Sequence, residues 1–268
     1  MLCFPNAKIN IGLRVLRRRA DGYHEIETLF YPVPLRDALE AVPAATTAFH
    51  LSGLLLPDVA PEENLVWKAL KLLEQTYTLP PLAIYLRKHI PFGAGLGGGS
   101  ADAAFMLKLL NACAALRLSD TELEALATTL GADCPFFIRN RPVLATGIGN
   151  RFEPVDLSLK GYTLWIVKPD VAVSTKEAYS WVKPSVPSVS LKELSARPVA
   201  EWKHGPVNDF EQSVCRRYPV IGAVKAQLYA QGAAYAAMSG SGSSVYGLFD
   251  KDVQMHFPGC FVWKGKLD

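Results

Sequence analysis

The spacing of apolar residues along the chain predicts four helices. Residues 64–77 repeat leucines and alanines at helical intervals, with charged residues between them. Residues 101–115 form an apolar run whose first turn is made of small residues. Ser119 and Glu122 form a capping-box sequence that begins a third helix. A fourth is predicted over residues 220–231.

Strand patterns lie between these helices. Short runs with alternating, β-branched or aromatic residues predict strands over 7–14, 25–31, 82–90, 162–167, 233–238 and 244–249. The Asp21-Gly22 turn between the first two favours a hairpin. Mixed helices and strands predict an α+β protein.

The chain changes character in its second half. Prolines become frequent from Pro142 onward, which places a domain boundary near residue 155 and predicts two domains, 1–155 and 156–268. Residues 183–206, rich in Pro, Ser and Val, are typical of a mobile connection or of a poorly periodic excursion of the chain.

Composition narrows the function classes. The 268 residues are 50% hydrophobic and 20% charged, and 28 basic against 25 acidic residues give a net charge of +3. Because the basic residues form no long tract, we expect an anionic small-molecule partner and no nucleic acid. The longest uncharged stretch, 226–249, holds four glycines and four serines, so no membrane span is expected.

The five cysteines are scattered, with no C-x-x-C pair, and indicate neither a disulfide framework nor a zinc site. The N-terminal residues do not have the pattern of a secretory signal, so we expect a cytoplasmic protein, either monomeric or weakly dimeric.

The strongest chemical signal is the sequence PFGAGLGGGSADAA over residues 91–104. Five glycines occupy seven positions, directly before a predicted helix. Backbone N–H groups of such a loop converge on an anion, and the start of the helix adds partial positive charge. The sequence therefore predicts a phosphate-binding loop.

Two well-known nucleotide loops do not fit. Gly93, Gly95 and Gly98 match G-x-G-x-x-G, but a second helix follows where a dinucleotide fold needs a strand and an acidic residue. The chain also has no G-x-x-x-x-G-K-[ST] loop. In another kind of cradle, Lys88 is a candidate cation and Ser100 offers a hydroxyl to phosphate or Mg²⁺. A solvated strand lysine is the alternative for Lys88.

Lys8 and Asn10 lie two apart on a predicted strand and share one face. They line a polar cleft or the solvated side of an edge strand. Tyr23 and His24 follow the Asp21-Gly22 turn. Either their rings stack on a planar base, or both residues simply belong to an exposed surface turn.

Asp133 follows the third predicted helix and precedes an apolar run. It is a helix cap or a partly buried carboxylate able to take a proton from an alcohol. Gly240 and Ser241 lie in a Ser/Gly loop between two strands, which is either a second anion nest or a plain hairpin loop.

Taken in order, these segments resemble the superfamily of galactokinase, homoserine kinase, mevalonate kinase and phosphomevalonate kinase. Within it, PNAKINIGL, RADGYHEI, GLGGGSADAA and LGADCPFF look like the branch acting on 4-diphosphocytidyl-2-C-methyl-D-erythritol in non-mevalonate isoprenoid synthesis. The likeness spans about residues 5–249. The glycine loop is common to the superfamily, whereas the Asp-Gly-Tyr-His segment is particular to this branch.

The resemblance implies transfer of phosphate from ATP, with Mg²⁺, to the 2-hydroxyl of that cytidine diphosphate-linked methylerythritol. Asp133 matches the catalytic base, Lys8 its partner, and Asn10 a residue near the acceptor. A different kinase of the superfamily and a non-catalytic nucleotide-binding regulator are the competing interpretations.

The resemblance also implies further binding residues. Tyr23, His24 and Tyr179 match the cytosine site, and Gly240 and Ser241 the late loop at the substrate. The metal ligands stay unassigned beyond Ser100; Asp102 is a first-turn helix residue or approaches the metal. The residues that match the ATP site are Pro91, Phe92, Gly93, Ala94, Gly95, Leu96, Gly97, Gly98, Gly99, Ser100, Ala101, Asn64 and Lys88.

The fold implied by the resemblance has an N-terminal domain like domain 2 of ribosomal protein S5. The C-terminal domain is a ferredoxin-like split βαβ arrangement, and the active site lies in the cleft between the two.

Overall fold

The computed structural model describes residues 1–54 and 60–268 and separates into two compact units. The first contains residues 1–7, 35–92 and 97–141, and the second contains 8–34, 93–96 and 142–268. The units are interleaved along the chain, so a single cut near residue 155 does not describe them. As a division into functional domains, that cut stays a prediction.

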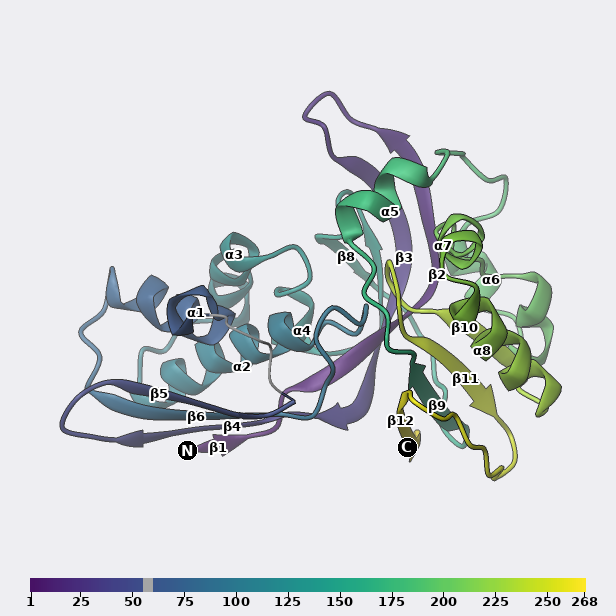
Figure 1. Cartoon of the computed structure of the whole chain (residues 1–268). Helices are drawn as coiled ribbons and strands as arrows, with labels where there is room; N and C mark the ends of the chain where they lie inside the picture. The colour runs from purple at the N-terminus through teal and green to yellow at the C-terminus, as the bar shows by residue number, and fades with distance from the viewer. Residues whose placement is uncertain (55–59) are drawn as a thin grey trace. The chain divides into compact units, whose positions relative to one another are not determined.

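The first unit has a four-stranded sheet in the order β1-β4-β6-β5 (Figure 1). β4 is antiparallel to β6, whereas β5 runs parallel to it. In β6, Ile84 and Leu86 are buried and Tyr85 and Arg87 are exposed, which confirms the predicted alternation. The strands are β1 (Leu2–Cys3), β4 (Ala38–Pro43), β5 (Ala48–Gly53) and β6 (Leu82–Lys88).

Helices cover one face of this sheet (Figure 1). They are η1 (Pro61–Glu63), α1 (Leu65–Glu74), α2 (Gly98–Cys113), α3 (Asp120–Leu130) and α4 (Phe136–Arg139). The Ser119 capping box is present. α2 begins three residues earlier than predicted, inside the glycine run. Apolar periodicity cannot detect a helical turn made of glycine and serine.

The second unit holds two four-stranded sheets, β2-β3-β7-β8 and β10-β11-β9-β12. The long strands β2 (Asn6–Arg18) and β3 (His24–Arg36) are joined by a turn at residues 19–23, as the hairpin prediction requires. The others are β7 (Val143–Thr146), β8 (Arg151–Pro154), β9 (Thr163–Lys168), β10 (Tyr235–Met238), β11 (Val245–Phe249) and β12 (Phe261–Lys266).

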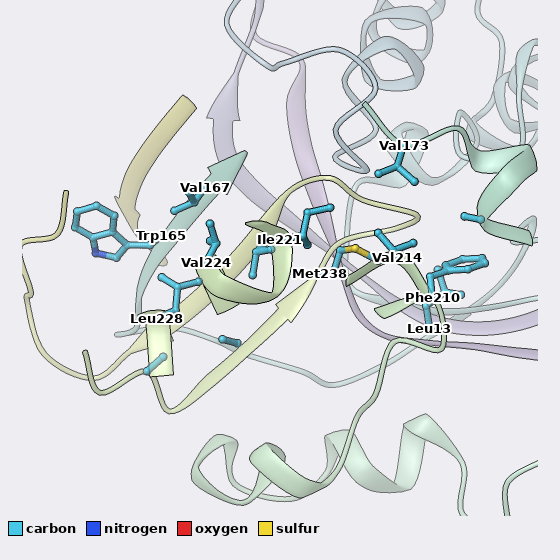
Figure 2. Close-up of a cluster of buried hydrophobic side chains, with 14 of the residues drawn as sticks. Leu13, Trp165, Val167, Val173, Phe210, Val214, Ile221, Val224, Leu228 and Met238 are labelled. Carbon is cyan, nitrogen blue, oxygen red and sulfur yellow. The ribbon is translucent and has the colours of Figure 1, made fainter. Parts of the chain in front are cut away.

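Helices of this unit build its core (Figure 2). α8 contributes Ile221, Val224 and Leu228, which cluster with Val167 of β9 and Met238 of β10. Burial of these side chains, each worth about 1.5–3 kcal/mol, holds the helices on the sheet. The helices are α5 (Thr175–Trp181), α6 (Leu191–Ser195), η2 (Val199–His204), α7 (Glu211–Arg217) and α8 (Pro219–Ala230).

Residues 183–206 form a poorly periodic excursion with short helices, which is the second of the two predicted alternatives. They contain α6 and η2, and the Ser185 amide donates to the Val15 carbonyl at 2.9 Å. The Leu191 amide donates to a Glu27 carboxylate oxygen at 2.5 Å, and Trp202 is 1% exposed. These contacts join residues that are far apart in sequence, so no local sequence pattern could predict them.

Among the residues that the structure describes, no helix has the length and apolar character needed to cross a membrane.

Candidate active site

Lys8 and Asn10 share one face of β2, as predicted, but that face is buried. Lys8 is 3% exposed and Asn10 is 2% exposed, which rules out the solvated edge-strand alternative. The Lys8 ammonium donates to Asn10 Oδ1 at 2.7 Å and to the Gly95 carbonyl at 3.2 Å. It also lies 4.8 Å from the centre of the Phe30 ring.

A network of neutral groups orients Asn10. Its Nδ2 donates to Thr28 Oγ1 at 2.9 Å, and that hydroxyl donates to the Gly12 carbonyl at 2.6 Å. The Tyr246 hydroxyl donates to the Asn10 carbonyl at 2.8 Å. Asn10 Oδ1 therefore faces Lys8 by construction, because its amide nitrogen is engaged on the other side.

The middle of the glycine loop packs against the late Ser/Gly loop. The Ser239 hydroxyl donates to the Gly95 carbonyl at 2.8 Å, and the Lys8 amide donates to the Leu96 carbonyl at 2.9 Å. An ideal Cβ on Gly95 would lie 2.0 Å from the Ser239 carbonyl oxygen, so only glycine permits this approach. Two loops about 140 residues apart in sequence thus form one surface beside Lys8.

Asn208 is a site residue that sequence reasoning missed. It is 1% exposed, and its Nδ2 donates to the carbonyls of Met238 and Gly240, both at 2.8 Å. These bonds fix the start of the late loop, where Ser241 Oγ also lies 3.0 Å from Thr175 Oγ1. The Asn-Asp dipeptide before α7 has no sequence pattern that would have revealed this role.

Tyr23 and His24 leave the hairpin turn in different directions. Tyr23 is 62% exposed, whereas the His24 ring stacks on Tyr179 of α5, with centroids 4.8 Å apart and planes 16° apart. Tyr179 in turn meets Phe210 edge-on at 4.9 Å. Burial, together with the nearby Arg18 charge, lowers the pKa of His24. The structure thus joins His24 and Tyr179 from distant segments into one aromatic group.

In the first unit, the glycine loop ends at the start of α2. Gly97 is the N-cap residue, with φ of 72°, and the cap has no side-chain hydrogen bond. The first amides of α2 therefore have no intrahelical acceptor and are directed out of the helix end, where an anion is favoured. Loop residue Phe92 is 65% exposed, and Ala101 is buried in the first turn.

Asp133 lies in the turn between α3 and α4 and is partly exposed. It does not cap α4, whose N-cap residue is Pro135. Its neighbour Cys134 is buried and hydrogen-bonds with Ser100; burial raises the pKa of this thiol to about 11. The Asp133 turn is thereby linked, through the next residue, to the first turn of α2.

Lys88 is neither a solvated strand residue nor open to a ligand on all sides. Its ammonium donates to Asp37 Oδ2 and, at 2.5 Å, to Asp102 Oδ2. Both carboxylates are buried, Asp37 at 1% and Asp102 at 2% exposure. Asp102 is therefore not the first-turn helix residue that the sequence analysis offered as one alternative: it lies in the second turn of α2 and forms a buried ion pair. Sequence reasoning missed Asp37 entirely.

Asn64 is the N-cap residue of α1, and its side chain accepts a hydrogen bond from the Val66 amide at 2.9 Å. Within residues 1–54 and 60–268, no group of three or more His, Cys, Asp or Glu side chains is arranged to hold a metal ion.

Two family models match the chain: "GHMP kinases N terminal domain" over residues 64–141 and "GHMP kinases C terminal" over residues 197–254. The α+β fold and these two matches define a kinase of the GHMP class with an N-terminal and a C-terminal domain. A mevalonate kinase from Methanococcus jannaschii has the same fold, with a TM-score of 0.70 at 13% identity, covering 100% of this chain and 98% of that one.

Relatives with higher sequence identity show to which family within the GHMP class the chain belongs. A 4-diphosphocytidyl-2-C-methyl-D-erythritol kinase from Parabacteroides distasonis is 62% identical over 271 residues, covering 100% of both chains. One from Bacteroides fragilis is 58% identical over 274 residues with the same coverage. A crystal structure of 4-(cytidine 5'-diphospho)-2C-methyl-D-erythritol kinase aligns with a TM-score of 0.78 at 36% identity, covering 92% of this chain and 90% of that one. The chain belongs to the 4-diphosphocytidyl-2-C-methyl-D-erythritol kinase family.

Proposed function

We propose that this protein transfers a phosphoryl group from ATP to the 2-hydroxyl of 4-diphosphocytidyl-2-C-methyl-D-erythritol. The carrying observation is the 62% identity over the whole chain with a kinase named for this substrate. The buried Lys8 ammonium beside the glycine loop supports it, because a phosphoryl transfer site needs a fixed positive charge next to a phosphate cradle.

ATP is proposed to bind with its phosphates on the glycine loop, residues 91–101, and at the start of α2. The exposed amides of the first turn and the helix dipole suit a polyphosphate. Asn64 and Lys88 would lie near the nucleotide. Mg²⁺ would be held by the ATP phosphates and the Ser100 hydroxyl, in keeping with its preference for oxygen ligands and few protein groups. Bound there, it would offset the phosphate charge.

Asp133 is proposed as the general base that takes the proton of the acceptor hydroxyl. Lys8 would stabilise the negative charge on the transferring phosphoryl group, while Asn10 orients both the ammonium and the acceptor. Asp133 and Lys8 belong to different compact units, so this proposal requires the substrate to contact both.

The cytidine end of the substrate is proposed to bind the aromatic group at the hairpin. Tyr179 and Tyr23 would stack on the cytosine, and His24 would hydrogen-bond the base edge. Gly240 and Ser241 would meet the anionic part of the substrate through backbone amides and a hydroxyl.

The finer architecture is proposed from the same family likeness. The N-terminal domain, 1–155, would have the ribosomal-protein-S5 type of fold and the C-terminal domain, 156–268, a ferredoxin-like one, with the substrates in the cleft between them. We propose a cytoplasmic enzyme, monomeric or weakly dimeric, with no nucleic-acid or membrane partner.

A coupled assay of ADP release tests the function. The purified protein with Mg-ATP should release ADP in proportion to added 4-diphosphocytidyl-2-C-methyl-D-erythritol, and cytidine monophosphate should compete. Mevalonate and homoserine are the matched acceptors that should give background rates. Turnover on either of them without competition by the cytidine nucleotide would identify a different GHMP kinase. ATP binding without turnover on any acceptor would identify a regulator.

A further inference from the structure

Lys88, Asp37 and Asp102, called the Lys88 cluster below, connect both ends of the glycine loop. Lys88 ends β6, three residues before Pro91, and Asp102 lies in α2 just after Ala101. The Lys88 ammonium donates to Asp102 Oδ2 at 2.5 Å. This buried ion pair therefore joins the end of the strand before the glycine loop to the helix that follows it.

Asp37 adds a second connection at the loop entrance. Asp37 Oδ1 accepts hydrogen bonds from the backbone amides of His89 at 2.5 Å and Ile90 at 2.8 Å. Asp37 Oδ2 accepts a hydrogen bond from the Lys88 ammonium. The Asp37 amide donates to the Pro5 carbonyl at 2.8 Å. The entrance of the loop is thereby fixed to the N-terminal strand region of the same unit.

The charges of the Lys88 cluster argue against a direct role of the ammonium on ATP. One positive charge faces two carboxylates whose side chains are 0% and 3% exposed. Such a cluster has no net positive charge to offer to a triphosphate, whether or not one carboxylate carries a proton. Asp102 Oδ1 is also buried without a hydrogen-bond partner in the described residues.

Close packing couples the cluster to the first turn of α2. An ideal Cβ on Gly98 would lie 2.8 Å from Ile90 Cγ2 and 3.4 Å from Lys88 Nζ. The first turn of α2 therefore packs directly on Lys88 and Ile90, the segment that Asp37 holds in place. A shift of this segment or of the helix start would move the α2 amides that would face the phosphates.

We infer that Asp37, Lys88 and Asp102 are positioning residues for ATP, which set the glycine loop and the start of α2 before the nucleotide arrives. The inference rests on the proposed function for its ligand and assigns the Lys88 ammonium to the loop rather than to the nucleotide.

Asp102→Asn, Asp37→Asn and Lys88→Met test this inference, measured by isothermal titration with Mg-ATP and by steady-state kinetics. Each should raise the Kd and KM for ATP about ten- to hundredfold, as expected for a displaced binding loop. The kcat at saturating ATP and the KM for the cytidine substrate should change less than about twofold, as for loss of uniform binding. The double variant Lys88→Met/Asp102→Asn should lose no more than the worse single variant.

A direct contact between the ammonium and ATP predicts the opposite sign. Neutralising Asp102 would then leave Lys88 more positive, and Asp102→Asn would tighten ATP binding. That result, or an unchanged ATP affinity, overturns the inference. Lys71→Met and Glu74→Gln remove an exposed ion pair of α1 in the same unit and are the matched controls, with no expected effect.

Hydrogen exchange of the nucleotide-free protein separates this inference from the proposed function. Amides of residues 91–101 should exchange about tenfold faster in Asp102→Asn than in wild type, while residues 8–34 and 142–268 of the second unit should exchange at the wild-type rate. Wild-type protein that fails the ADP-release assay refutes the proposed function, while the exchange rates still decide the role of the cluster. Equal exchange in the two proteins overturns it.

Discussion

The carbonyl oxygen of Ser239 occupies the place that a side chain on residue 95 would need. An ideal Cβ on Gly95 would lie 2.0 Å from that oxygen, and the φ of Gly95 is +73°. The contact brings the late Ser/Gly loop against the glycine loop beside the Lys8 ammonium, which donates to the Gly95 carbonyl. The shape of the candidate site beside Lys8 therefore depends on residue 95 being glycine, because any side chain there would separate the two loops.

Gly95→Ala should strongly reduce both stability and ATP use, because the loops must separate to admit the methyl group. Gly93→Ala is the matched control: its φ is +60°, but nothing lies within 4 Å of the added Cβ. The control should lose only the left-handed strain of about 1–2 kcal/mol. Urea unfolding and the KM for ATP measure both. Equal losses in the two variants would contradict the close-packing argument.

Asp133→Asn should lower kcat about 10²- to 10⁴-fold, because an amide cannot accept the hydroxyl proton. ATP affinity should stay close to that of wild type, since the proposed role of Asp133 concerns the acceptor. Single-turnover phosphoryl transfer and equilibrium titration with ATP separate the two effects. Near-normal turnover in this variant would remove Asp133 from the mechanism.

Thr28→Val tests the network behind Asn10. Valine has the shape of threonine but leaves Asn10 Nδ2 and the Gly12 carbonyl without their hydroxyl partner. We expect a loss of about 1–3 kcal/mol in the free energy of unfolding. The KM for the cytidine substrate should also rise as Asn10 loses its orientation. Thr28→Ser keeps the hydroxyl and should recover most of the substrate affinity; a serine variant as impaired as valine would argue for packing alone.

Tyr179→Ala should weaken binding of cytidine nucleotides by about 1–2 kcal/mol, or about five- to thirtyfold, because it removes the proposed stacking surface. It also removes the contacts with His24 and Phe210. Tyr179→Phe retains the ring and should bind nearly as wild type. Competitive inhibition by cytidine monophosphate measures the affinity, and an unaffected alanine variant would place the base elsewhere.

His24 should become protonated at a lower pH than an ordinary histidine, because its pKa is lowered in the folded protein. Burial and then the Arg18 charge lower the pKa of His24 from its usual 6.5, so the ring is neutral at neutral pH. The unfolded chain takes up this proton at higher pH than the folded chain. The contribution of His24 to stability is therefore complete above about pH 6.5 and is lost as the pH falls through the lowered pKa.

Proton NMR of the His24 ring should give a titration midpoint below 6.5, and Arg18→Gln should move it upward. Cytidine binding should weaken over the same acid range if the neutral ring contacts the base. A midpoint at or above 6.5 would contradict the environment described for this ring.

Local patterns predicted the four longest helices, α1, α2, α3 and α8, and six of the strands, but not the remaining elements of the described structure. The alternation of Ile84 and Leu86 against Tyr85 and Arg87, and the capping box at Ser119, are confirmed because each depends on residues a few positions apart. The short helix α6 and its attachment to β3 were missed. Five residues give too little periodicity, and Glu27, which accepts from the Leu191 amide of α6, lies far away in sequence.

The amino-acid sequence by itself determined the kind of chemistry. Glycines followed by a helix specify an anion cradle, and the Asp-Gly-Tyr-His segment distinguishes one branch of these kinases from the rest. Only the tertiary structure decided the surroundings of each lysine: the buried Lys8 ammonium donates to Asn10 and to the Gly95 carbonyl of the glycine loop, whereas Lys88 is paired with Asp37 and Asp102. Both lysines look alike in a strand pattern, because the partners that set the effect of each charge come from distant segments and become neighbours only on folding.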